Sequence, residues 1–329
     1  MMHNKISSDR NTLIGAMGAP AGERESSAKA SRKDYLLMKR LFLAAALLVA
    51  LLVPVSAASA APFNPTGPWA RFNDCTLNKP QTILCLYAET TSGSITLGSK
   101  TTPVVKPVVL QGGLTINPET GELIFLGAED GNTLTKAAQP VPGGLLGITA
   151  PAWWPSFLRN LFNETINNGF TGVTATMELA GPPSSVHLNP GALIEQTGTA
   201  LQMPVKIKLD NPFLGSSCYI GSNSNPIVLN LTTGTTSPPP PNTPIKGSVK
   251  SVLPEPGSGG TIEKIDDAKL VDNSFSVPGA SGCGGLFSFL IDPFVNSIVG
   301  IPSAAGKNTA ILEGDQWLTS AEAVKASIP

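Results

Sequence analysis

A strict alternation of apolar and polar side chains constrains this chain more than any other feature. Over residues 201–209, whose sequence is LQMPVKIKL, every second position is apolar, and residues 173–179, VTATMEL, show the same period. A period of two places one set of side chains on a buried face and the other in water, as in a half-buried β-strand. Pro204 lacks a backbone N–H donor, so we expect that strand to be an edge strand or to bulge at this point.

Glycine and proline divide the rest of the chain into short segments. The chain contains 33 Gly and 30 Pro, and only 14% of its residues are charged. This composition is typical of β proteins with many turns. The segment NPETG at 117–121 predicts a hairpin turn, because Pro occupies its second position and Gly ends it. Further strands are expected at 82–87, 94–97, 104–110, 114–116, 122–126, 227–231, 248–253, 269–276 and 310–312. We therefore predict a mainly β fold, an antiparallel β-sandwich of short strands.

Two segments depart from the β pattern and predict one or two short amphipathic helices. In residues 153–168 the apolar side chains recur on one helical face, with Pro155 suited to a first turn and Asn168 to the C-terminal end. Residues 286–301 are rich in Phe, Leu, Ile and Val, but Asp292 and Pro293 divide them. We expect two short helical pieces or one kinked helix there, too short and too polar to span a membrane.

The N-terminal region predicts export. Lys39 and Arg40 precede a charge-free apolar run of 13 residues at 41–53, and small residues follow up to Ala60. This order is that of a signal peptide over residues 38–60. The alternative is an uncleaved anchor, although a helix of this length reaches only ~20 Å, short of the ~30 Å hydrocarbon core. Residues 1–37 are polar, and we interpret them as a mis-called start or a disordered leader.

All four cysteines follow the signal segment. An even number in an exported chain favours two disulfides over a redox or metal site. Three pairings are possible, and we favour Cys75 with Cys85 and Cys218 with Cys283. A four-cysteine zinc site is the alternative, but it normally needs closely spaced pairs, whereas 9, 132 and 64 residues separate these cysteines. We expect a secreted or cell-envelope protein.

The proline-rich segment 237–243 suggests a division of the exported chain. Four consecutive prolines adopt polyproline II and cannot join a β-ladder. We interpret this segment as a stiff loop between a main β domain at 61–236 and a C-terminal β part at 244–329 that packs on it. A ligand for a proline-binding module is the alternative. A Cys218–Cys283 bridge would connect the two parts covalently, so the division would then not separate independent domains.

Three motifs suggest a family. They are CYIGS at 218–222, NLTTGTTS at 230–237 and GKNTAIL at 306–312. Over residues 200–315, mainly through these motifs, the chain resembles uncharacterised secreted proteins of actinobacteria. The resemblance implies export and a high-GC bacterial source. It implies no activity, cofactor or site residue.

The residues that usually carry catalysis are scarce after the signal segment. One histidine remains, His187, and a single His within a short strand is most often structural. The sequence lacks the G-x-S-x-G and H-E-x-x-H motifs. The closest acidic groups are Glu129-Asp130, Glu263 and Asp266-Asp267, which we place in turn-like stretches where solvated acids are ordinary. We therefore name no catalytic residue, no metal ligand and no cofactor.

The charge and the aromatic residues limit the partners. Residues 61–329 carry 19 acidic and 14 basic residues without a basic cluster, which argues against nucleic acid. The candidate binding residues are Trp153, Trp154 and Phe157. Their helix either caps an open end of the sandwich as core, which we favour, or forms a hydrophobic lip for an apolar ligand, lipid or partner protein. With Arg159 as its one basic residue, this helix does not favour stable membrane docking.

The sequence as a whole favours a non-catalytic, secreted or cell-envelope-associated β-sandwich with a structural or binding function. Its partner would be an envelope component or an apolar ligand. One alternative is an extracellular carrier of an apolar small molecule or lipid, with residues 153–170 and 286–301 lining the cavity. Another is a secreted hydrolase that relies on carboxylates alone.

Overall fold

The structure is a computed structural model and describes residues 64–168 and 170–328. The predicted leader at 1–37 and the signal segment at 38–60 lie outside the described residues. Within the described part, the chain is mainly antiparallel β, as the sequence predicts, and its strands join one 14-stranded sheet. The hairpin expected at 117–121 connects two of them, with Asn117 and Glu122 paired across the turn.

The sheet and helices have the following bounds. The strands are β1 Leu84–Leu97, β2 Lys100–Pro103, β3 Val108–Ile116, β4 Leu123–Gly127, β5 Gln139–Pro140, β6 Thr174–Leu179, β7 His187–Leu188, β8 Leu201–Asp210, β9 Tyr219–Ile220, β10 Ile227–Leu231, β11 Ser251–Pro254, β12 Ile262–Asp272, β13 Ala280–Ser281 and β14 Thr309–Ser320. The α-helices are α2 Ser156–Asn167, α3 Pro190–Glu195, α4 Ser288–Val299 and α5 Ala321–Ala326. Short 3-10 turns are η1 Gly67–Phe72, η2 Gly144–Leu146, η3 Pro183–Ser185 and η4 Gly285–Phe287.

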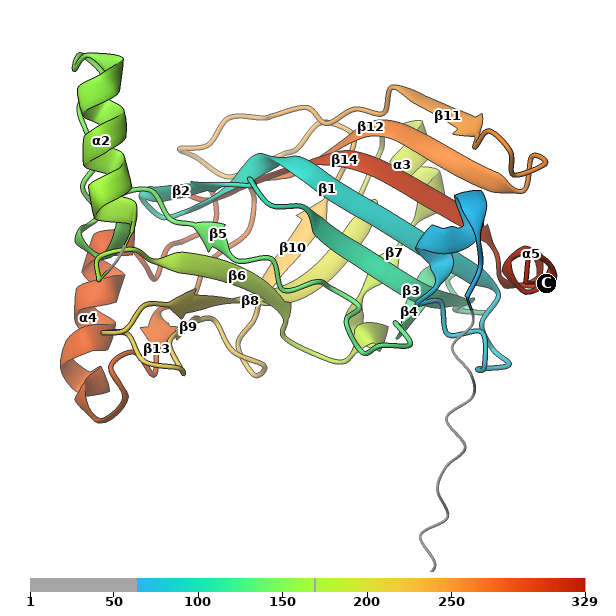
Figure 1. Cartoon of the computed structure of the whole chain (residues 1–329), viewed down its shortest axis with the longest axis horizontal. Helices are drawn as coiled ribbons and strands as arrows, with labels where there is room; N and C mark the ends of the chain where they lie inside the picture. Colours follow the sequence, from blue (N-terminus) through green and yellow to red (C-terminus); the bar gives the residue numbers. More distant parts are fainter. Residues whose placement is uncertain (1–63, 169, 329) are drawn as a thin grey trace, which may run out of the picture. The chain divides into compact units, whose positions relative to one another are not determined.

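The sheet curves over itself into two layers (Figure 1). Its strands follow the order β11-β12-β14-β1-β3-β4-β7-β8-β6-β5, and β10 and β9 also pair with β8. The first six strands form one layer, while β8 and its neighbours cross beneath them. The main core lies between the layers, with Leu114, Phe125, Met203 and Leu229 among its fully buried side chains. Burial of these apolar side chains is the principal stabilisation of the fold.

Several strands differ in their bounds from those that the sequence predicts. The strands expected at 82–87 and 94–97 are parts of the single strand β1, which begins at Leu84, and those expected at 104–110 and 114–116 are joined in β3, which begins at Val108. β14 extends well beyond the expected 310–312, whereas β12 begins before the expected 269–276 and ends at Asp272. The prediction failed where polar residues interrupt the apolar pattern, as at Glu313 and Asp315, because these half-exposed side chains belong to a continuing strand. β1 is nevertheless irregular, with a register shift against β14 between Thr90 and Ser92.

The expectation that β8 is an edge or bulged strand at Pro204 is wrong. β8 has partners along both sides, with β10 opposite Pro204 and β6 and β7 on the other side. The Pro204 carbonyl accepts a hydrogen bond from the Ala180 N–H, one residue beyond the end of β6. In an antiparallel pair an N–H at position 204 would donate a second hydrogen bond back to Ala180, but proline has no N–H. The missing bond lies where the pairing of β8 passes from β6 to β7, so β8 does not have to be an edge strand at Pro204.

Residues on both sides of the proline-rich segment 237–243 build the same sheet. β14, near the C-terminus, pairs with β1 on one side and with β12 on the other. The loop itself is tied to this C-terminal part, because the Asn242 side chain donates to the carbonyls of Asn273 and Asn308 at 2.9 Å. Residues on both sides of segment 237–243 therefore contribute to the same main core.

Both favoured disulfides are confirmed. Cys75 is bonded to Cys85 and Cys218 to Cys283, and all four side chains are buried. The first bridge lies in a second small core with Phe72, where η1 and α5 cover the outer face of the sheet. The second connects the β9 region to the segment before α4. Disulfides of this kind are those of a chain that folds in an oxidising environment.

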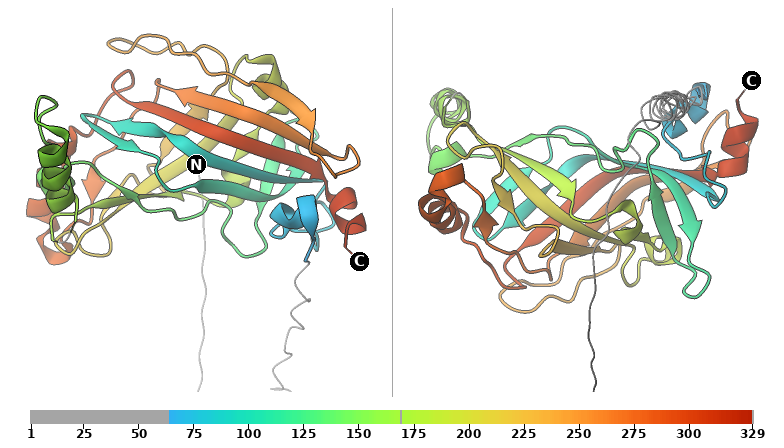
Figure 2. Two further views of the ribbon diagram at one scale, coloured as in Figure 1. Left: turned by 45° about the horizontal axis from the view of Figure 1, so that its top comes forward. Right: turned by 90° about the horizontal axis from the view of Figure 1, so that it is seen from below.

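The helices occupy opposite ends of the sandwich. α2 and α4 lie together at one end, whereas α5 and η1 lie at the other, and Figure 2 shows the same arrangement from two more directions. The axes of α2 and α4 run in a similar direction, across the run of the long strands (Figure 1). In the right-hand view of Figure 2 both helices are seen almost end-on.

Candidate functional site

The first component of the candidate site is α2. Residues 153–168 form a helix as predicted, with bounds at 156–167, and its apolar side chains follow one face. The expectation that this helix belongs to the core is wrong, because no side chain of α2 is buried. Trp153 is 81% exposed, Phe157 69% and Leu161 61%. The sequence has thus formed an amphipathic helix whose apolar face remains in water.

Few contacts attach α2 to the sandwich. The Asn163 and Asn167 side chains accept hydrogen bonds from the backbone N–H groups of Ala150 and Gly143, at 3.1 and 2.9 Å. The half-buried ring of Trp154 packs edge-on against Phe162 at 5.6 Å between centroids and against Trp153 at 6.1 Å. These aromatic contacts order the three rings locally and leave Trp153 and Phe157 exposed.

The second component is η4 with α4. Asp292 and Pro293 do not divide this segment, which forms one helix over 288–299 after the 3-10 turn. Pro293 removes only the donor that would reach the Phe289 carbonyl. Asp292 has a structural function, because its carboxylate accepts hydrogen bonds from the N–H groups of Cys283 at 2.8 Å and Gly282 at 3.2 Å.

α4 and η4 are apolar on two opposite sides. The inner side contributes Ile291, Val295, Ile298 and Val299, of which Val295 is only 5% exposed. The outer side is uncovered: Leu286 is 94% exposed, Phe289 71%, Phe287 63% and Leu290 59%. Apolar sides of a helix are normally covered by protein or lipid. Only the inner side of α4 is covered by the residues that the structure describes.

Loops connect the two helices into one surface. The Phe170 and Phe213 rings are 6.4 Å apart, and the Asn211 side chain donates to the Phe170 carbonyl at 2.8 Å. The carbonyl of Leu214, the residue after Phe213, accepts a hydrogen bond from the N–H of Gly284, directly before η4. Phe170 is 74% and Phe213 59% exposed. We call this surface the apolar end; its members are Trp153, Phe157, Leu161, Phe170, Phe213, Leu286, Phe287, Phe289 and Leu290.

The apolar end has almost no charge. The segments that build it, residues 141–173, 211–215 and 282–301, contain only three charged residues: Arg159, Glu164 and Asp292. The Arg159 guanidinium donates to the Ala152 carbonyl at 3.1 Å, and Asp292 is turned toward the backbone of the preceding loop. Contiguous exposed apolar surfaces of this kind mark interaction sites in soluble proteins.

A cavity of about 70 Å³ lies between the sheet and the inner side of α4. Its apolar lining includes Leu97, Ile207, Val295 and Val299, and Lys100 lies at its margin, where its ammonium donates to the Gly147 carbonyl at 2.9 Å. The cavity adjoins a second one of about 60 Å³ between the layers, since Leu97 and Ile207 line both. The segment 286–301 therefore lines a cavity as the carrier hypothesis requires, whereas α2 does not contribute to that lining.

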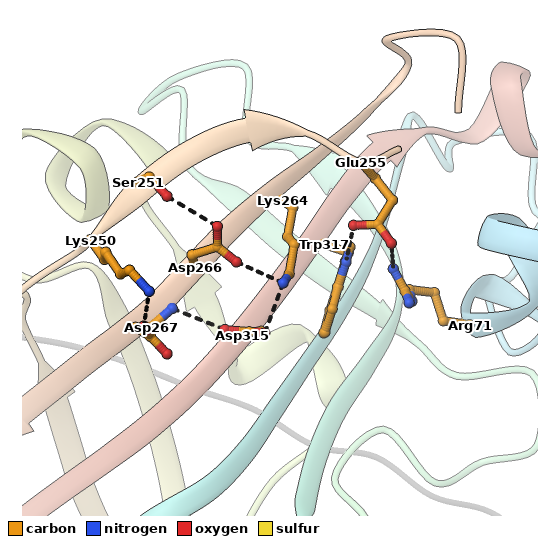
Figure 3. Close-up of polar contacts among 9 residues, drawn as sticks. All are labelled: Arg71, Lys250, Ser251, Glu255, Lys264, Asp266, Asp267, Asp315 and Trp317. Carbon is orange, nitrogen blue, oxygen red and sulfur yellow. Dashed lines mark hydrogen bonds and ion pairs between the residues drawn. The ribbon is translucent and has the colours of Figure 1, made fainter. Parts of the chain in front are cut away.

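The most polar cluster lies on the water-facing surface of β11, β12 and β14 (Figure 3). A register shift in β12 between Ile265 and Ala268 presents both Asp266 and Asp267 to this surface. Lys264 bridges two carboxylates, with its ammonium 2.6 Å from Asp266 and 3.0 Å from Asp315. The acids at 263, 266 and 267 thus lie on a strand, and the expectation of a turn is wrong for them; Glu129 and Asp130 do lie in a turn.

Hydrogen bonds shift the pKa values of Asp266 and Lys264 in this cluster. Those from Lys264 and Ser251 lower the pKa of Asp266, and the bond to Asp266 raises the pKa of Lys264. Asp266 therefore stays ionised and does not have the raised pKa that a general acid needs. In the neighbouring group, Glu255 accepts from the Trp317 indole at 3.0 Å and from Arg71 at 3.1 Å, as Figure 3 shows. We interpret both groups as structural.

The remaining candidate residues do not form a site with one another. His187 lies in β7, where its Nδ1 is 3.5 Å from the carboxylate of Glu122, the residue before the neighbouring strand β4. Burial and the nearby charges of Asp130 and Glu129 raise the pKa of Asp74, but those two acids lie in an exposed turn. Among the described residues, no group of three or more His, Cys, Asp or Glu is placed to hold a metal ion.

The comparisons give no relative for the chain. No family model, no curated protein and no solved structure matches it. In the part of the chain that the structure describes, no helix is long and apolar enough to cross a membrane.

Sequence reasoning found part of the apolar end and missed the rest. Trp153 and Phe157 belong to it, whereas the half-buried Trp154 packs beside Trp153 and is not a member. Phe213 was missed, although it follows Pro212 and precedes Gly215 by two residues, which marks an apolar side chain in a turn. The outer position of Leu286, Phe287 and Phe289 could not be read from the sequence, because an all-apolar segment does not indicate which side faces the core.

Proposed function

We propose that this protein is a secreted or cell-envelope-associated, non-catalytic β-sandwich that binds an apolar component of the envelope through its apolar end. The observation that carries the proposal is the exposure of large side chains from α2, η4, α4 and two connecting loops at one end of the sandwich. The predicted signal segment and the resemblance to secreted actinobacterial proteins support the location.

The energetics favour a partner for this surface. Fully burying one Leu or Phe side chain is worth ~1.5–3 kcal/mol. Seven of the side chains at the apolar end are more than 60% exposed: Trp153, Phe157, Leu161, Phe170, Leu286, Phe287 and Phe289. An isolated helix of about 12 residues is also marginal in water. A partner that covers α2 would therefore stabilise the helix and gain the burial of its apolar face.

The proposal is tested by retention on envelope preparations. Full-length protein isolated from the producing cells is compared with the variant Leu286→Ser/Phe287→Ser/Phe289→Ser. The matched control is Val105→Ser/Ile116→Ser/Leu253→Ser, which removes three side chains that are 56%, 48% and 54% exposed and lie outside the apolar end. We expect the first variant to be lost from the envelope fraction and the control to be retained. Equal retention of all three proteins would overturn the proposal.

A second function, carriage of an apolar small molecule, is supported by the cavity behind α4. Its volume of about 70 Å³ is small beside the ~300–1,000 Å³ of typical ligand pockets, so α4 would have to move outward to admit a ligand. Organic extraction of protein isolated from its producing cells, followed by mass spectrometry, tests this function. A stoichiometric apolar compound that the variant Val295→Trp excludes would favour the carrier.

A further inference from the structure

We propose that the apolar end docks on an uncharged lipid surface, with α2 and α4 lying in the plane of that surface and the long strands standing away from it. The inference rests on the proposed function and names the class of partner. It follows from the charge of the apolar end, the direction of its helices and the apolar character of α4.

The few charged residues of the apolar end indicate which kind of lipid it can bind. Helices that bind anionic membranes carry Lys and Arg on their polar face. Here the three segments that build the surface contain a single basic residue, Arg159, and one acid on the same helix, Glu164. With one basic side chain and an acid on the same helix, this surface has little to attract anionic headgroups. Docking therefore needs no anionic lipid, and zwitterionic or uncharged lipids suffice.

The geometry suits a planar, fluid surface. α2 and α4 run in a similar direction at the same end of the sandwich, and both cross the direction of the long strands (Figures 1 and 2). Two such helices can lie together in an interface with their apolar sides ~5–10 Å deep, at the boundary of headgroups and acyl chains. Trp153, three residues before α2, is of the residue type that is enriched at that depth.

The side chains themselves favour lipid over a protein partner or a second copy. Leu286, Phe287 and Phe289 project from η4 and the first turn of α4, and Leu286 is 94% exposed. A protein partner must supply a matching hollow for each projecting group together with a hydrogen-bonding rim. Acyl chains are fluid and adapt to any arrangement. The sequence argued against membrane docking from α2 alone, whereas the structure adds α4, which has an uncovered apolar side of its own.

The test is flotation of the full-length protein with protein-free vesicles. Vesicles of phosphatidylcholine alone are compared with vesicles that also contain phosphatidylglycerol, at low salt and at about 0.5 M salt, where charge interactions are screened. We expect binding to both vesicles within about twofold and no loss at high salt. Leu286→Ser/Phe287→Ser/Phe289→Ser should lower the partition coefficient about 1,000-fold, at roughly tenfold per large side chain. The control Val105→Ser/Ile116→Ser/Leu253→Ser should bind as the wild type does.

Each other outcome overturns the inference in a recognisable way. Binding only to the anionic vesicles, with loss at high salt, would overturn the assignment to uncharged lipid. A dimer in sedimentation equilibrium that dissociates in the apolar-end variant, without vesicle binding, would identify a second copy as the partner. Failure to float combined with retention on envelope preparations through the same residues would mean a protein or glycan partner. That last result would leave the proposed function standing, whereas loss of retention would remove both.

Discussion

The two sides of α4 should respond differently to substitution, because one is core and the other is not. Val295 is 5% exposed, so Val295→Ala removes two buried methyl groups, worth ~0.8 kcal/mol each. It also enlarges the adjoining cavity, which adds to the cost at ~24 cal/mol per Å³. We predict a total loss of about 2–3 kcal/mol in the free energy of unfolding.

The outer side has little burial to lose. Phe289 is 71% exposed, so at most about a third of the ~3 kcal/mol of a fully buried Phe is at stake. Phe289→Ser should therefore cost below about 1 kcal/mol, and Leu286→Ser, at 94% exposure, close to nothing. Guanidinium unfolding gives these values as shifts in midpoint at constant slope. A loss from Phe289→Ser as large as that from Val295→Ala would refute the reasoning, because the outer side of α4 would then be core.

Three further predictions concern the sandwich. Replacing Cys218 and Cys283 by Ala opens a loop of 65 residues and should cost about 4 kcal/mol, against about 3 for the 10-residue loop of Cys75 and Cys85; equal losses measured by denaturant unfolding would contradict the loop-entropy account. Burial raises the pKa of Asp272 above its ordinary 3.8. The contribution of this carboxyl group to stability is therefore full below pH 3.8 and falls as pH rises through the folded-state pKa. The unfolding free energy of the wild type minus that of Asp272→Asn should decline over that range, and a rise would be inconsistent with burial as the cause. Glu255→Gln should cost about 1–2 kcal/mol and change the Trp317 fluorescence, because a charged acceptor of both Arg71 and the indole is lost; an unchanged spectrum would argue against this contact.

Local patterns in the sequence predicted the local structure well. The alternation at 201–209 became β8, with all five of its apolar side chains buried, and the spacing at 153–168 became α2. The short helix α5 was missed, although Ser320 caps it by accepting from the Ala323 N–H and Glu322 and Lys325 suit its two ends. That signal was present in the sequence.

Long-range pairing could not be predicted in the same way. β1 and β14 pair along their lengths although more than 200 residues separate them, and no local pattern encodes that choice. The acids at 266 and 267 resembled a turn because a β-bulge allows two consecutive polar residues to reach the same surface. The direction in which α2 and α4 face likewise depends on which elements cover them, and the sequence of a single helix does not contain that information.

The helix α2 at the apolar end contributes little to the stability of the free protein, and the proposed binding should stabilise it. The core between the layers accounts for the fold without α2, whose attachment relies on a few hydrogen bonds such as those that Asn163 and Asn167 accept from backbone N–H groups. A weakly attached helix opens easily, and its amides exchange rapidly when it is free. Binding that covers the helix should slow that exchange, which provides a direct readout of the contact surface.

Amide hydrogen exchange with and without envelope vesicles is therefore the most direct test of the central claim. We predict that protection rises in residues 156–167 and 285–299 and stays unchanged in β8, whose amides already lie inside the sheet. Protection that appears instead over the polar surface of β11, β12 and β14, with α2 and α4 unaffected, would contradict the assignment of the apolar end as the binding surface.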